Sequence, residues 1–230
     1  MRSWLRAVIL DLDDTLYAER SYFESGLCAV ANFVAGPDEG LRAAWRERLF
    51  ADVRENGRVG ALDRIPAPPG RLEDGWVATL LQVYRTHRPT IAPFPDVAPF
   101  ITRARGERVR IGLVTDGKSC AQRRKIEALG LAGKLDAVIC SDDIDAPKPG
   151  VESFVAAAAL IGAPVEACIY IGDDPSKDFI GPRRLGMETI RLRRPLPHPI
   201  AKPAVDPAAD ARHCVASLAE AGDLMFGGTL

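Results

Sequence analysis

Short apolar runs, each bounded by polar residues, recur along most of the chain. Five of them have the length and composition of buried strands, and they cover residues 8–12, 109–114, 135–140, 167–171 and 189–192. Apolar residues at helical spacing lie between the later runs and predict helices over 119–129, 151–161 and 179–185, each followed by a glycine that can end it. Strands that alternate with helices predict an α/β protein, with a Rossmann-like parallel sheet that is covered on both faces.

The pattern changes after the first strand. Between residues 17 and 91 the apolar residues occur only at helical spacing, and they predict helices over 22–34, 39–53 and 72–84. We therefore predict an α/β core domain of residues 1–16 and 92–230, with an all-helical domain of residues 17–91 inserted after the first strand. A last helix is predicted over 208–225, after a proline-rich loop.

The composition adds little to this fold but excludes some classes of function. The 230 residues carry 30 Lys+Arg and 31 Asp+Glu, without the basic excess of nucleic-acid-binding or membrane-surface proteins, so we expect neither kind of partner. No apolar run approaches the roughly 20 residues that span a bilayer. The N-terminal residues lack a signal-peptide cleavage site. The five cysteines are scattered, which is typical of reduced thiols and predicts a cytoplasmic location.

Acidic residues follow several of the predicted strands directly. Asp11, Asp13 and Asp14 follow the first strand, Thr115 and Asp116 the second, and Asp173, Asp174 and Asp178 the fourth, while Lys148 lies between the third and the fourth. Ligands bind at the carboxyl edge of a parallel sheet, where these residues would meet. Carboxylates gathered there repel one another unless a cation lies among them, and Mg²⁺ prefers such oxygen ligands together with substrate phosphate. The sequence therefore predicts a Mg²⁺-dependent phosphoryl site.

The first acidic pair predicts the covalent chemistry. Asp11 ends its strand, so its carboxylate can serve as metal ligand and as nucleophile, and an aspartyl-phosphate splits one difficult displacement into two easier ones. Asp13 points the same way if the chain stays extended, which suits it as general acid and then general base. We also count Asp13 among the predicted metal ligands, together with Asp11, Asp173 and Asp178.

The remaining residues predict phosphate recognition. Thr115 offers a hydroxyl and a backbone N–H to phosphate oxygens, and Lys148 would neutralise charge between the nucleophile and the phosphoryl group. Asp116 is expected beside the phosphate, where its charge would tune selectivity. Asp178 is expected to orient Lys148 or a metal-bound water, and the sequence leaves open whether Asp174 or Asp178 is the second acidic group at the metal.

Each of these motifs has a simpler explanation when it is taken alone. Residues 11–15 suit a turn with a helix cap, and Asp-Gly at 116–117 is a common turn. The Asp-Pro pair at 174–175 suits the start of a helix, and Lys148 by itself would be a surface lysine. Their order at successive strand ends favours one shared site.

This constellation resembles the haloacid dehalogenase-like (HAD) hydrolase superfamily over nearly the whole chain. The family's motifs are matched by Asp11-Leu-Asp13-Asp-Thr15, by Thr115, by Lys148-Pro149 and by the run 172–178. The resemblance implies a helical cap of the first type, and it is greatest to phosphoglycolate phosphatase-like proteins. True haloacid dehalogenases lack an acid two residues after the nucleophile, so Asp13 favours phosphate-ester hydrolysis. The chain departs from the common pattern at Asp14 and Asp116, where many members carry Gly and Asn.

We therefore predict a Mg²⁺-dependent phosphatase that hydrolyses a small soluble phosphomonoester. In the resembled family such a cap closes over its substrate, and Arg20 is a candidate contact, although a solvated arginine fits the sequence equally well. One alternative is a phosphomutase related to β-phosphoglucomutase. Another is a phosphate-accepting receiver-type domain, against which the helical insertion argues. The sequence predicts the class of reaction and not the particular substrate or the oligomeric state.

Overall fold

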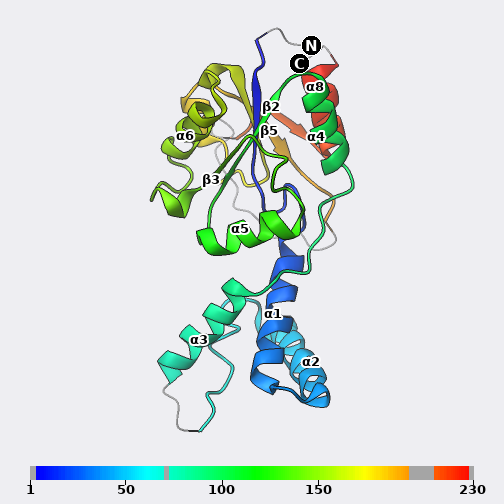
Figure 1. The fold of residues 1–230 in the computed structure, drawn as a ribbon, viewed down its shortest axis with the longest axis vertical. Coiled ribbons are helices and arrows are strands. Elements are labelled where there is room, and N and C mark those ends of the chain that lie inside the picture. The colour runs from blue at the N-terminus through cyan, green and yellow to red at the C-terminus, as the bar shows by residue number, and fades with distance from the viewer. Residues whose placement is uncertain (1–3, 70–72, 197–209, 228–230) are drawn as a thin grey trace. The chain divides into compact units, whose positions relative to one another are not determined.

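The α/β part of the chain is built on a six-stranded sheet. The computed structural model describes residues 4–69, 73–196 and 210–227. The strand order is β3-β2-β1-β4-β5-β6, and neighbouring strands pair in parallel (Figure 1). The strands are β1 (Ala7–Leu10), β2 (Arg110–Thr115), β3 (Ala137–Cys140), β4 (Cys168–Gly172), β5 (Glu188–Leu192) and β6 (His213–Val215). The predicted Rossmann-like α/β fold is confirmed.

The central strand β1 consists of four apolar residues, all of them buried. Such burial is expected for a strand with neighbours on both edges and helices over both faces. Val8 is level with Ile111 of β2. Leu10 is level with Ile171 of β4, and the amide of Asp11 donates to the carbonyl of Ile171 at 2.8 Å. This register brings the segments that follow β1 and β4 together at the carboxyl edge of the sheet.

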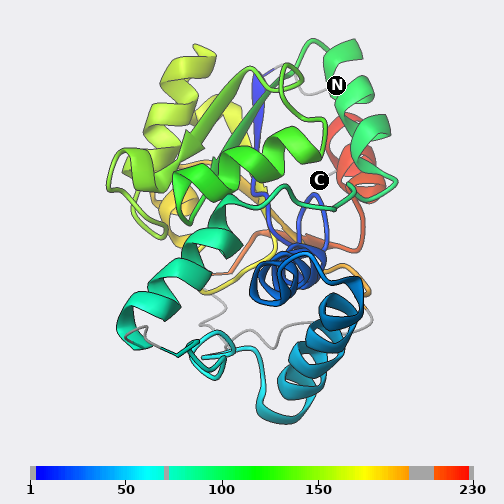
Figure 2. The same cartoon turned by 60° about the horizontal axis from the view of Figure 1, so that its bottom comes forward.

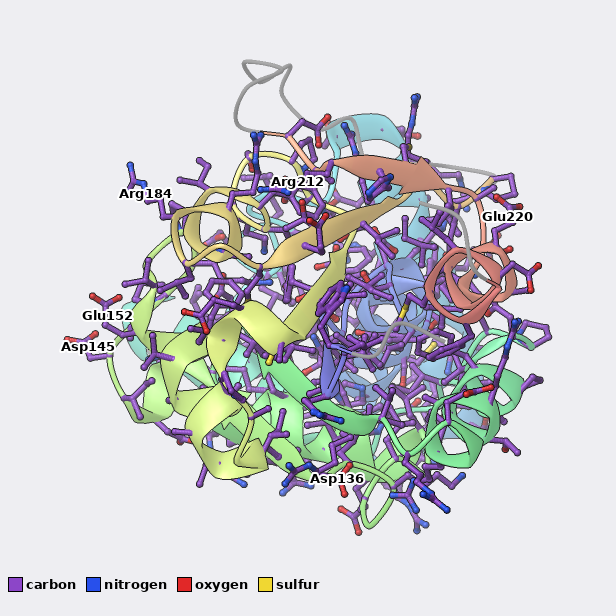
Figure 3. All side chains as sticks on the ribbon, turned by 90° about the horizontal axis from the view of Figure 1, so that it is seen from above. Asp136, Asp145, Glu152, Arg184, Arg212 and Glu220 are labelled. Carbon is purple, nitrogen blue, oxygen red and sulfur yellow. The ribbon has the colours of Figure 1, made fainter. Side chains whose placement is uncertain are left out.

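Helices cover both faces of this sheet. The described residues form α1 (Glu19–Ala35), α2 (Glu39–Asn56), α3 (Glu73–Thr86), α4 (Val97–Gly106), α5 (Ser119–Ala128), α6 (Glu152–Ile161), α7 (Ile180–Arg184) and α8 (Leu218–Phe226), with short 3₁₀ turns at Ser141–Asp143 and Val165–Ala167. In Figure 1, α6 lies over one face of the sheet and α4 and α8 over the other, and Figure 3 shows α7, which carries Arg184, on the same side as α6. Under α6, the rings of Phe154 and Tyr170 meet edge to face, with centroids 5.0 Å apart. This packing holds Tyr170 in the middle of the sheet, below the carboxyl edge.

The helical segment after β1 forms a compact unit of its own. Residues 20–91 make up this helical unit, and residues 1–19 and 92–230 make up the sheet unit. In the helical unit α1 lies between α2 and α3 (Figure 2). Its core consists of six buried residues: Val30, Ala31, Leu49, Ile65, Trp76 and Leu80. The helical unit therefore has a hydrophobic core separate from that of the sheet unit.

Two parts of the predicted secondary structure need correction. The last helix begins at Leu218, where Ser217 caps it by accepting from the amide of Glu220, and not at residue 208. Residues 213–215 form the edge strand β6 instead, and the amide of Arg193 donates to the carbonyl of Val215 at 2.8 Å. Helix α4 is absent from the predicted elements. The predicted proline-rich loop between 197 and 207 and the first residues of the predicted last helix lie outside the described residues.

Among the helices in the described ranges, none has both the length and the apolar composition that crossing a membrane would require.

Candidate active site

The side chain of Lys148 lies fully buried at the carboxyl edge of the sheet, between two carboxylates. Its Nζ donates to Oδ1 of Asp11 at 2.6 Å, to Oδ1 of Asp178 at 2.7 Å and to the hydroxyl of Tyr170 at 3.2 Å. Burial disfavours the ammonium form, but the carboxylates of Asp11 and Asp178 outweigh this effect and hold the pKa of Lys148 well above its ordinary value. Lys148 is therefore a fixed positive charge next to the end of β1.

Asp178 connects Lys148 to the loop that follows β4. Its Oδ2 accepts from the amides of Asp173 at 3.0 Å and Asp174 at 2.8 Å, and its Oδ1 also accepts from the hydroxyl of Tyr170. Gly172 is required here, because a Cβ at this position would collide with the Asp178 carboxylate. Asp178 thus orients both the ammonium and the loop, which is one of the two roles that the sequence left open.

Asp11, Asp173 and Asp178 form an acidic group. Each has a carboxylate oxygen within 4.8 Å of the others. Burial raises the pKa of Asp11 to about 6, with Lys148 opposing the rise and Asp178 adding to it. Carboxylates this close repel one another, so the group favours an additional cation, and its hard oxygen donors fit Mg²⁺. Asp174 is engaged elsewhere, because its Oδ1 accepts from the amide and the hydroxyl of Ser176.

The carboxylate of Asp13 lies in a different set of contacts. Nζ of Lys125 donates to its two oxygens at 2.8 and 3.0 Å, Nε2 of Gln122 donates at 3.1 Å, and the hydroxyl of Tyr17 donates as well. Burial acts to raise the pKa of Asp13, but the charge of Lys125 and these hydrogen bonds outweigh it, so the pKa is lowered. Among the described residues, Asp13 does not belong to the acidic group that fits a metal ion.

Thr115 and Asp116 stand where β2 ends. Thr115 is buried, and its hydroxyl accepts from Nε2 of Gln122, the same nitrogen that donates to Asp13. Oδ1 of Asp116 accepts from the backbone amide of Lys148 at 3.2 Å. The observed contact of Asp116 therefore supports the Lys148 segment, a role that the sequence did not predict for it.

Comparison with known proteins identifies the family. The model of the haloacid dehalogenase-like hydrolases matches residues 5–186. The chain belongs to this family. A glyceraldehyde 3-phosphate phosphatase from Methanopyrus kandleri is 32% identical to the hydrolase over 203 residues, which cover 83% of this chain and 84% of that protein. A phosphoserine phosphatase from Thermus thermophilus is 28% identical over 193 residues, which cover 84% of this chain and 68% of that protein.

Solved structures share the fold of the hydrolase. The crystal structure of the putative HAD-hydrolase YfnB from Bacillus subtilis, described as bound to magnesium, superposes with a TM-score of 0.67 at 19% identity. The similarity covers 96% of this chain and 99% of that one. At this level of identity the similarity concerns the fold alone.

The loop after the first motif of the hydrolase is held by its own side chains. Asp14 has a positive φ of 54°, a conformation that Asp tolerates better than most residues, and its Oδ1 accepts from the amide of Glu19 at 2.9 Å. Arg194, which follows β5, donates to the carbonyl of Thr15 at 3.0 Å and pairs with both carboxylate oxygens of Asp96 at 3.0 Å. The departure from glycine at position 14 is thus compatible with an ordered loop.

Arg20, the predicted substrate contact, belongs to the helical unit. Its Nε pairs with the carboxylate of Glu24 at 2.6 Å on the exposed surface of α1. The other predicted site residues all lie in the sheet unit.

Sequence reasoning missed three residues of the site: Tyr17, Gln122 and Lys125. A signal for two of them is present in α5. Gln122 and Lys125 lie on the helix face that also carries the buried residues Ala121 and Ile126. Polar side chains within the apolar face of a helix indicate a buried polar partner.

Proposed function

We propose that this hydrolase is a Mg²⁺-dependent phosphatase that cleaves a small phosphomonoester through an aspartyl-phosphate at Asp11. The observation that carries the proposal is the buried ammonium of Lys148, whose Nζ lies 2.6 Å from Oδ1 of Asp11. Asp11 also belongs to the acidic group that it forms with Asp173 and Asp178. A nucleophile, a fixed positive charge and a cluster of oxygen donors are the parts that phosphoryl transfer needs. The phosphatase names of the two relatives reported above support the same reaction class.

The reaction would proceed in two steps. A carboxylate oxygen of Asp11 forms a bond to phosphorus, the phosphorus–oxygen bond of the ester breaks, and the leaving oxygen takes a proton from Asp13. A water oxygen then attacks phosphorus and gives a proton to Asp13. The bond to Asp11 breaks, and inorganic phosphate and the carboxylate are restored.

Asp13 must change its protonation state during this cycle. Without substrate it is held as a carboxylate by Lys125, which is the form that the second step requires. A phosphate dianion bound beside Asp13 would add like charge and raise the pKa of this carboxyl, so a proton can be taken up from solvent before the first step.

Asp11, Asp173 and Asp178 are the residues that would hold Mg²⁺. When bound, the ion supplies positive charge that offsets the carboxylates and the phosphate oxygens. Lys148 complements that charge from within the protein, and Thr115 would donate a hydrogen bond to a phosphate oxygen from the end of β2.

The substrate would be a small phosphorylated metabolite. Glyceraldehyde 3-phosphate and phosphoserine, the compounds in the names of the two relatives, each carry one phosphate on a three-carbon skeleton. We propose that the helical unit acts as the cap that selects among such compounds, with Arg20 as a candidate contact. A cytoplasmic location, predicted from the cysteines, agrees with a metabolite as substrate.

The test is phosphate release from a panel of three-carbon phosphates, sugar phosphates, nucleotides and p-nitrophenyl phosphate, with Mg²⁺ and with EDTA. Asp11→Asn should lower release by more than about a thousandfold, because the nucleophile is lost. Asp145→Asn is the matched control, since Asp145 is an exposed acid that points outward (Figure 3). Mass spectrometry after acid quench should find a phosphoryl group on the peptide with Asp11. Full activity of Asp11→Asn would contradict the proposal.

A further inference from the structure

The carboxylate of Asp13 accepts more hydrogen bonds than its predicted role as general acid and base requires. Lys125 donates to both of its oxygens, Gln122 to one of them, and the hydroxyl of Tyr17 to the other. The donors come from two places in the chain, the loop after β1 and the helix α5. Both oxygens of Asp13 therefore have fixed directions in space.

Lys125 stands out among these donors. Its side chain is only 7% exposed, compared with 58% for Lys118 just before the same helix. Its neighbours on the buried face of α5 are Ala121 and Ile126, and an aliphatic residue at position 125 would pack there without the cost of burying an ammonium. An ion pair of this kind is weak evidence for stability, so a role in the site explains Lys125 better.

Gln122 couples this arrangement to the predicted phosphate-binding residue. Its Nε2 lies between Oδ2 of Asp13 and the hydroxyl of Thr115 and donates to both. The side chain is almost fully buried. Any rotation of the Asp13 carboxylate would break contacts to Lys125 and Gln122 together, which gives Asp13 one strongly preferred orientation.

We propose that Lys125, assisted by Gln122, is a positioning residue that holds Asp13 in the orientation for transferring a proton to the leaving oxygen. The inference rests on the proposed function. Its consequence depends on the leaving group. An alkoxide is a poor leaving group and needs the proton, whereas p-nitrophenolate leaves readily without it.

The experiment compares Lys125→Met with the wild-type full chain in Mg²⁺, using phosphoserine and p-nitrophenyl phosphate. We expect kcat/KM, which reports the first step alone, to fall about 100-fold for phosphoserine, in the range of lost general acid–base catalysis. The value of kcat/KM for p-nitrophenyl phosphate should fall less than about tenfold, because its leaving group needs no proton in that step. Asp13→Asn should show the same difference between the two esters. Lys134→Met, at an exposed lysine of the sheet unit, is the control and should match wild type.

Two further variants keep the test decisive if Lys125→Met does not fold. Lys125→Arg retains the charge and should recover part of the phosphoserine activity. Gln122→Leu removes only the amide donor and should shift the ratio of the two kcat/KM values in the same direction. Equal losses of kcat/KM on both esters, or no loss, would overturn the inference. If Asp11→Asn stays active, the proposed function fails instead, so the two failures are distinguishable.

Discussion

The ionised form of Asp11, which its proposed role as nucleophile requires, lowers the stability of the folded protein. Its pKa is raised to about 6 by burial, compared with 3.8 for an ordinary Asp. The ionised form is therefore disfavoured by folding. This penalty to the free energy of unfolding is absent below about pH 4, grows as the pH rises towards 6 and is complete above it. Each unit by which the pKa is raised corresponds to about 1.4 kcal/mol.

Asp11→Asn should consequently raise the melting temperature in EDTA, and the gain should be larger at pH 8 than at pH 5. Mg²⁺ should stabilise the wild type, because it binds the folded state, and should stabilise the variant much less. Thermal unfolding at both pH values, with and without Mg²⁺, measures all of these differences. A gain that is independent of pH would show that Asp11 is not strained in its charged form.

The strand-end residues of the site were predictable for a definite reason. Asp11 and Asp173 directly follow buried strands, and the carboxyl ends of parallel strands meet wherever the sheet forms. Lys125 could not be placed in the same way, because nothing in the sequence specifies which side chain the inner face of α5 meets. Its burial could have been suspected from the adjacent apolar residues, but its pairing with Asp13 depends on the packing of α5.

Close backbone packing beneath Lys148 leads to a prediction for helix α7. A Cβ at Gly181 would lie 2.8 Å from the carbonyl oxygens of Pro149 and Gly150, which directly follow Lys148. Gly181→Ala should therefore destabilise the protein by about 1–3 kcal/mol, the range seen for overpacking, and lower kcat by displacing Lys148. Gly106→Ala, where the space is open, should be neutral or slightly stabilising.

Urea unfolding and steady-state kinetics on the two variants provide the measurement. Unchanged stability and kcat in Gly181→Ala would mean that the backbone after Lys148 can shift to accommodate the methyl group without a loss of stability.

The elements that the sequence missed have identifiable causes. Helix α4 has buried residues at 97, 100, 101 and 104, which is regular helical spacing, but it directly follows a proline-rich stretch and carries Pro99 in its first turn, where proline is tolerated. Strand β6 is only three residues long and is held by hydrogen bonds to β5. Three residues are too few for an alternating pattern that would predict a strand from the sequence. This strand forms because it pairs with β5.

At the scale of the whole molecule, the two units have separate hydrophobic cores, so damage to one should leave the chemistry of the other intact. Leu80 is fully buried in the helical unit. Leu80→Ala should destabilise that unit by about 2–5 kcal/mol, the usual cost of such a cavity. Mg²⁺ binding by the sheet unit should not change. Leu41→Ala, at a leucine that is 52% exposed, is the control.

Calorimetric unfolding and Mg²⁺ titration of both variants test this separation. A single cooperative transition, or a loss of Mg²⁺ affinity in Leu80→Ala, would show that the two units are coupled.

The scarcity of lysine gives the buried ammonium groups a use as chemical reporters. Only six of the 30 basic residues are lysines, and the rest are arginines, which amine-reactive reagents do not modify. Lys118 and Lys177 have side chains that are 58% and 39% exposed, whereas those of Lys125 and Lys148 are 7% and 0% exposed. Acylation of the native protein should therefore spare the latter two. The rate at which Lys125 and Lys148 become labelled would therefore measure how often each side chain is exposed to solvent.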